Sequence, residues 1–184
     1  MAFTQYDLAP LEGASLWGYL EMARTLRLAT VQDDDPIELC PLWFVVHRET
    51  VYFAIEPTVG DPGRAMTPGF RHAAALDANC RVTALVDDGE DLTTFRGAQV
   101  SGRARLVEQA KLRETLLDLA LEKYFYVGHP HLEHFLSRGA CEARRWYRID
   151  AERVAGWDRR LLPQPPIKER RTLPPHLRQG KRKD

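Results

Sequence analysis

Residues 39–55 read LCPLWFVVHRETVYFAI, and this stretch is the main reason to expect a fold built from β-strands. The first eight of these residues are almost wholly apolar, which indicates a strand with both faces covered. Polar residues 47–49 interrupt the pattern, and a second apolar run begins at residue 51. Two apolar runs separated by a short polar turn are typical of a β-hairpin. We therefore predict paired strands over residues 39–46 and 51–55.

Further strands and helices surround this hairpin. Alternating or apolar patterns predict strands at residues 25–32, 81–86, 95–107 and 143–149. Helical spacing of apolar side chains predicts helices at residues 15–24, 71–78, 111–125 and 130–136. Six strands joined mostly by short turns favour a mainly β fold, a closed antiparallel barrel with flanking helices, over a sandwich. Parallel crossover units are absent from the pattern, so a doubly wound nucleotide-binding fold fits poorly.

The chain of 184 residues suits one domain with a C-terminal appendage. We assign residues 1–162 to the barrel domain and residues 163–184, which are rich in Pro, Lys and Arg, to a tail. Residues 167–184 hold seven basic and two acidic side chains, which leaves 19 basic and 24 acidic side chains in residues 1–166. A mildly acidic body repels polyanions, so we do not expect nucleic acid to be the partner.

The cysteines and the N-terminal sequence bear on the compartment. Cys40, Cys80 and Cys141 are odd in number and widely spaced, which is typical of a reducing cytoplasm. The N-terminal residues lack the features of a secretion signal, and no window approaches 18 consecutive apolar residues. We therefore expect a cytoplasmic protein that does not span a membrane.

Several short motifs together resemble one known family, the pyridoxamine 5′-phosphate oxidase-like flavin-binding split barrels. They are RLATV at 27–31, PLWF at 41–44, VYF at 51–53, Arg71-His72, NCRV at 79–82, Arg96-Gly97, Gly102-x-Ala104 and Val154-x-x-Trp157. Each motif alone is degenerate, so their order and spacing over roughly residues 15–160 carry the resemblance.

This resemblance implies a six-stranded antiparallel Greek-key split barrel. It also implies a homodimer with flavin mononucleotide (FMN) in each of two clefts between the subunits. In the family, basic residues at the start of the helix after the third strand bind the phosphate, and helix N-termini favour anions. The residues that the resemblance assigns to the cofactor are Pro41, Leu42, Trp43, Ala54, Arg64, Arg71, His72, Arg96 and Trp157.

The activity implied is that of a flavin-dependent oxidoreductase acting on a small organic substrate, which the sequence does not identify. The cofactor would perform the redox chemistry, so no side chain needs to act as an acid or a base, and we assign no catalytic residue. Three alternatives stay open. They are a deazaflavin-dependent reductase, a flavin-binding or haem-binding module without turnover, and an empty barrel that serves protein interactions.

The histidines at 129, 131 and 134 form the only local pattern that suggests a metal or haem. Pro130 is placed as the first residue of a helix would be, which would make His129 a side chain of the cap region. No cysteine or paired carboxylate completes a tetrahedral set in the sequence nearby, so we predict no metal site.

Overall fold

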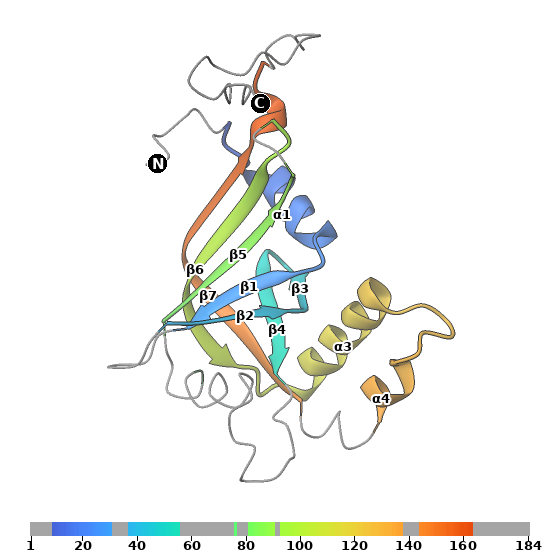
Figure 1. Cartoon of the computed structure of the whole chain (residues 1–184). Coiled ribbons are helices and arrows are strands. Elements are labelled where there is room, and N and C mark those ends of the chain that lie inside the picture. Colours follow the sequence, from blue (N-terminus) through green and yellow to red (C-terminus); the bar gives the residue numbers. More distant parts are fainter. Residues whose placement is uncertain are drawn as a thin grey trace, which may run out of the picture.

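The computed structural model describes residues 9–30, 37–55, 76, 81–90, 93–137 and 144–163. Its helices are α1 (Gly13–Met22), α3 (Ala110–Tyr124) and α4 (Leu132–Leu136), and a short 3-10 helix η2 spans Arg159–Leu161. Its strands are β1 (Leu26–Thr30), β2 (Glu38–Leu42), β3 (Phe44–His47), β4 (Thr50–Ile55), β5 (Arg81–Asp88), β6 (Arg96–Leu106) and β7 (Arg145–Asp158). Figure 1 shows the strands curling around one interior, with α3 and α4 to one side.

The seven strands form one antiparallel sheet in the order β2-β1-β5-β6-β7-β4-β3. The contacts of β1 with β5 and of β7 with β4 join strands that are distant in sequence, as in a Greek key. The two edge strands, β2 and β3, are consecutive in the chain and are separated only by Trp43. The sheet therefore curls until its two edges meet at one residue, and the predicted mainly β split barrel is confirmed.

The strand count differs from the predicted six because the apolar run 39–46 divides at Trp43. Leu42 pairs with Leu26 of β1, whereas Phe44 pairs with Phe53 of β4, so one run supplies both edges of the sheet. The expectation of two covered faces holds for β3, three of whose four residues are buried. It is wrong for β2, whose residues alternate between partly buried and exposed.

The long strands β6 and β7 form the spine of the sheet and pair along most of their lengths. A strand was predicted only over residues 143–149, but β7 continues to Asp158. Residues 151–154 in the second half of β7 are exposed on both faces of the sheet. They therefore lack the alternation of apolar and polar residues from which a strand is predicted. Backbone pairing with β6 holds this half in the sheet.

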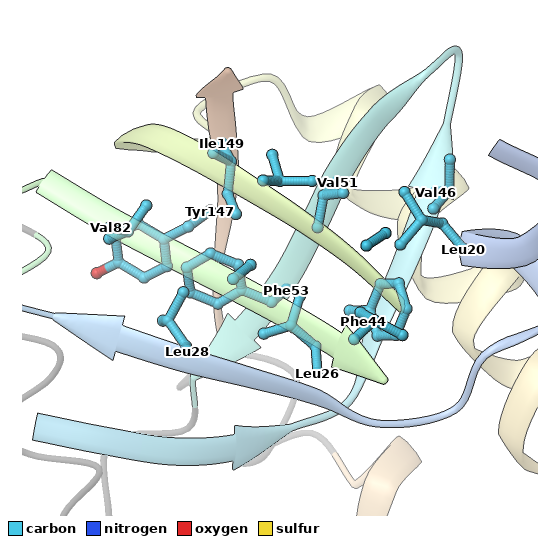
Figure 2. Packing of buried hydrophobic residues seen from close by; sticks show 14 of the residues in the cluster. Leu20, Leu26, Leu28, Phe44, Val46, Val51, Phe53, Val82, Tyr147 and Ile149 are labelled. Carbon is cyan, nitrogen blue, oxygen red and sulfur yellow. The ribbon is translucent and has the colours of Figure 1, made fainter. Parts of the chain in front are cut away.

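The inside of the curled sheet contains the main apolar core. Leu20 of α1 meets Leu26 of β1 and Phe44 of β3 there, and Figure 2 shows these side chains close together. Phe53 of β4 stacks on Tyr147 of β7, with ring centroids 5.7 Å apart and an interplanar angle of 16°. Helix α1 thus covers one end of the barrel and buries its apolar face against the strands.

A second cluster of buried residues lies on the outer face of β3, β4 and β7. Leu116, Ala120 and Tyr124 of α3 pack there, at helical spacing. The other buried members of the cluster are Val45, Tyr52, Val107 and Trp146. This packing places the C-terminal end of α3 beside the junction of β2 and β3, where the candidate site lies.

Gly102 sits at the one register shift between β6 and β7. A Cβ atom at this position would lie 2.1 Å from the backbone oxygen of Asp150, closer than real Cβ contacts. We expect Gly102→Ala to lower the free energy of unfolding by about 2 kcal/mol, because the strands must separate locally to admit the methyl group. Urea unfolding measures this loss.

Gly18→Ala serves as the control for that substitution. Gly18 lies in α1, and a Cβ there has nothing within 4 Å. We expect this change to stabilise the chain by about 0.5–1 kcal/mol, since alanine is the better helix former. Equal effects of the two substitutions would contradict the close approach at Gly102.

No helix among the described residues is long and apolar enough to cross a membrane.

Candidate functional site

A pocket of about 420 Å³ opens between the outer face of the sheet and the helices α3 and α4. Its walls come from the β2–β3 junction, from β4 and β7, and from the ends of both helices. Aromatic and aliphatic side chains dominate the lining, which consists of Pro41, Leu42, Trp43, Phe44, Val45, Ala54, Ala120, Tyr124, Phe125, His131, His134, Phe135, Arg144 and Trp146. Pockets of this size and apolar character are typical of small-molecule and cofactor sites.

Trp43 forms the most exposed aromatic wall of this pocket. Its ring stacks on that of Tyr124, with centroids 4.7 Å apart and an interplanar angle of only 9°. Phe125 meets the indole edge-on at 5.5 Å, and Phe135 lies tilted at 6.3 Å. Trp43 nevertheless remains 47% exposed, so it offers aromatic surface to a ligand rather than filling the core.

Tyr124 ties this wall to the sheet through its hydroxyl group. The backbone N–H of Phe44 donates to the Tyr124 oxygen at 3.0 Å. The hydroxyl proton lies within reach of the carbonyl oxygens of Phe44, at 2.8 Å, and Arg24, at 2.9 Å. Burial raises the pKa of Tyr124 to about 12, so the group remains a neutral donor throughout the physiological range.

The polar groups of the pocket lie on the side of α4. His131, His134 and Arg144 line it. Arg144 is only 5% exposed, donates to the carbonyl oxygen of Phe135 at 2.8 Å and lies 3.7 Å from the centroid of that ring. The pocket thus combines aromatic walls with a buried cation at one side.

The histidine segment differs from its predicted form. Helix α4 begins at Leu132 rather than at Pro130, and the Nδ1 of His129 accepts a hydrogen bond from the backbone N–H of His131 at 3.2 Å. His129 packs against Phe125 and Tyr126 instead of joining the pocket. Within the described ranges, no three His, Cys, Asp or Glu side chains are grouped so that they could hold a metal ion.

The structure brings together four of the nine residues assigned to the cofactor, namely Pro41, Leu42, Trp43 and Ala54, all of which line the pocket. Arg96 and Trp157 lie elsewhere, at the opposite end of β7. Arg64, Arg71 and His72 are outside the described residues. Sequence reasoning missed Tyr124, Phe125, Phe135, Arg144 and Trp146, although the aromatic triplet 124–126 at the end of a helix was a visible signal.

Arg96 and Trp157 form a second group of residues near the ends of β6 and β7. The guanidinium group of Arg96 bonds to the carboxylate of Asp88 at 2.7–2.9 Å and lies 4.4 Å from the centroid of the Tyr19 ring. Burial, followed by the charge of Asp88, raises the pKa of Tyr19 to about 12. The Tyr19 hydroxyl and the Trp157 indole N–H are buried and have no hydrogen-bond partner within the described ranges.

The family model for pyridoxamine 5′-phosphate oxidase matches residues 12–157, most of the chain. The chain belongs to this family. The match includes the pocket residues from both the β2–β3 junction and α3, as well as Arg96 and Trp157.

Several solved structures have the same fold as this chain, although their sequences are less than 25% identical to it. A conserved hypothetical protein from Mycobacterium tuberculosis has a TM-score of 0.65 and 23% identity, covering 90% of this chain and 96% of that one. An FAD-binding protein from Mesorhizobium loti has a TM-score of 0.57 and 19% identity, with coverages of 82% and 97%. The haem storage protein HutZ from Vibrio cholerae has a TM-score of 0.57 and 18% identity, with coverages of 78% and 94%. No curated protein matches the sequence.

Lys123 of this chain lies beside the wall of the pocket, on the side that faces α1. Its ammonium group is 4.0 Å from the centroid of the Phe44 ring and 3.4 Å from the carbonyl oxygen of Leu20. The pKa of Lys123 falls from 10.5 to about 8, mainly because of burial and to a smaller extent because of the charge of Arg24, while the charge of Glu21 opposes the shift. The lysine therefore titrates within an accessible pH range.

This titration predicts a pH-dependent stability. Between about pH 8 and pH 10 the unfolded chain binds more protons at Lys123 than the folded chain, so the contribution of Lys123 to the free energy of unfolding rises with pH. We expect Lys123→Met to be more stable than the wild type at pH 7 and to lose that advantage towards pH 10. Urea unfolding at several pH values measures the difference.

Lys111→Met is the matched control, because Lys111 is an exposed lysine of the same helix. It should reproduce the pH profile of the wild type. Profiles of the wild type and Lys123→Met that stay parallel from pH 7 to pH 10 would show that the lysine does not titrate as described.

Proposed function

We propose that this chain is an FMN-binding flavoprotein and acts as an oxidoreductase on a small organic substrate in the cytoplasm. The observation that carries this proposal is the aromatic-walled pocket of about 420 Å³, which unites Pro41, Leu42, Trp43 and Ala54 in a member of the pyridoxamine 5′-phosphate oxidase family. A flat isoalloxazine ring needs flat apolar walls of this kind.

The residues present fit the ring portion of such a cofactor. The exposed indole of Trp43 offers a stacking surface, and Phe125 and Phe135 pack around its edge. Arg144 places a positive charge beside these rings, which would stabilise an anionic group of a ligand or substrate bound there. When bound, FMN would supply the transfer of hydride or electrons, and the chain would position it and exclude water.

A second subunit would complete the site. Trp146, in the pocket, and Trp157, beside Arg96, lie eleven residues apart on β7, up to about 35 Å along an extended strand. The two groups thus lie near opposite ends of β7 within one chain. We propose a homodimer in which the pocket of one subunit faces the Arg96 and Trp157 group of the other.

The second group contains two buried donors and a cation. The Tyr19 hydroxyl and the Trp157 indole N–H lack acceptors among the residues described, and buried donors without acceptors are costly. Both atoms are already closed off from solvent within one subunit, so a ligand or a second subunit would reach them only after a local rearrangement. The side chain of Arg96 would add a cation there, although Asp88 already balances its charge.

Haem binding without turnover is the second candidate function. His131 and His134 line the same pocket, and imidazole nitrogen is a common axial ligand of haem iron. The structural neighbour HutZ is named as a haem storage protein. A deazaflavin in place of FMN is a variant of the first proposal, since its tricyclic ring requires the same flat walls.

The absorption spectrum of the purified protein, with mass spectrometry of any ligand released on denaturation, distinguishes these functions. Flavin bands and the mass of FMN are the expected result. The mass of a deazaflavin would change the proposed cofactor but leave the proposed binding pocket unchanged. A Soret band would favour haem. Protein that carries none of these ligands and binds none when they are added would overturn the proposal.

A further inference from the structure

The hydroxyl group of Tyr124 occupies the position of a missing strand at the split in the barrel. β3 is an edge strand, so the backbone groups on its outer side have no neighbouring strand to pair with in the part of the chain that the structure describes. At Phe44, where β3 begins, the N–H donates to the Tyr124 oxygen instead. The Phe44 carbonyl oxygen is one of two acceptors, with that of Arg24, within reach of the single hydroxyl proton. One side chain from α3 therefore satisfies the backbone that a closed barrel would satisfy with β2.

The same side chain controls the residue before Phe44. Trp43 is the single residue between β2 and β3, so its backbone has no strand partner in the sheet. Its indole is held against the Tyr124 ring in a nearly parallel stack. The Tyr124 hydroxyl thus fixes the backbone at Phe44, and the Tyr124 ring fixes the indole that the backbone carries.

A third contact fixes Tyr124 itself. Its hydroxyl reaches the carbonyl oxygen of Arg24, in the segment between α1 and β1, at 2.9 Å. The neighbouring Lys123 reaches the carbonyl oxygen of Leu20 in the last turn of α1. The C-terminal turn of α3 is therefore bonded to α1, to the segment that follows α1 and to the start of β3.

We propose that Tyr124 is a positioning residue, which holds the backbone at the start of β3 and orients the exposed face of Trp43 for a planar ring ligand. This inference rests on the proposed function in so far as the ligand is a flavin. The orientation of Trp43 itself is a property of the ligand-free chain and can be measured separately.

The first test uses the protein without ligand. Tyr124→Phe removes the hydroxyl and keeps a ring for Trp43 to stack on. The fluorescence of Trp43 is obtained as the difference between each protein and the same protein with Trp43→Phe. We expect acrylamide to quench this fluorescence about two-fold more strongly in Tyr124→Phe than in the wild type, because the indole is no longer fixed and moves more freely. Tyr126→Phe, which alters an exposed tyrosine two residues away, should leave quenching unchanged. Unchanged quenching in Tyr124→Phe would overturn the positioning role, whether or not the protein binds flavin.

The second test measures FMN affinity in a double-mutant cycle. We expect Tyr124→Phe to raise the Kd for FMN about five-fold in the wild-type background, in line with the loss of about one hydrogen bond. In a Trp43→Ala background the same change should have almost no effect, because Tyr124 acts through Trp43. Equal losses in both backgrounds would mean that Tyr124 contacts the ligand directly and would contradict the proposal. Wild-type protein that binds no FMN would refute the proposed function, and the quenching test would then decide the positioning role alone.

Discussion

Trp43→Ala is expected to raise the Kd for FMN by roughly ten- to hundred-fold, the range that stacking of a flat ring on an aromatic side chain provides. Trp43 is 47% exposed in the pocket and is already held parallel to Tyr124, so its open surface requires little rearrangement to receive a ring. Titration of FMN followed by flavin fluorescence measures the change.

Two variants control this result. Tyr126→Ala removes another exposed aromatic side chain of the same region, which does not line the pocket, and should leave the Kd unchanged. Trp43→Phe keeps a smaller ring and should lose less affinity than Trp43→Ala. An unchanged Kd in Trp43→Ala would remove this residue from the site and, with it, the main wall of the proposed ring pocket.

Phe53→Ala is expected to lower the free energy of unfolding by about 3–5 kcal/mol, the usual effect of truncating a fully buried aromatic residue. Phe53 has no exposed surface, lies on β4 and stacks on Tyr147 of β7. Its loss leaves a cavity where the strands of the curled sheet face each other (Figure 2). Chemical unfolding at constant pH measures the effect.

The same truncation at an exposed aromatic side chain provides the control. Tyr126 is 67% exposed, and we expect Tyr126→Ala to change the free energy of unfolding by no more than about 0.5 kcal/mol. A loss below about 1 kcal/mol in Phe53→Ala would contradict the packing of β4 against β7 inside the barrel.

Local sequence patterns predicted most of the fold. The hairpin of β3 and β4, the helix α3 and the long strand β6 are marked by apolar spacing and by polar turns, which depend on neighbours close in sequence. The division at Trp43 has no such mark, because the apolar run continues through it. It follows from pairing with two distant strands, β1 on one side and β4 on the other.

The site was predictable only in part, because some of its contacts join residues that are distant in sequence. Pro41, Leu42, Trp43 and Ala54 lie on a predicted hairpin and reach the pocket together. Tyr124 bonds to Phe44 across 80 residues, and no feature near either residue indicates that contact.

Arg96 and Trp157 illustrate the limit of motif order as a guide. Both match the family motifs, but motif order alone does not say whether two residues meet within one chain or across two. Within one chain, Trp157 and the pocket residue Trp146 lie near opposite ends of β7. The structure therefore divides the predicted cofactor residues that it describes into two groups, one in the pocket and one near the far end of β7.

The central claim is that a planar ring binds against Trp43 at the split of the barrel. A crystal structure of the protein grown with FMN tests it most directly. We predict isoalloxazine density stacked on the exposed face of Trp43, with Arg96 and Trp157 of a second copy beside it. Density for the ring at another place, or a single subunit that encloses FMN without using Trp43, would contradict the account.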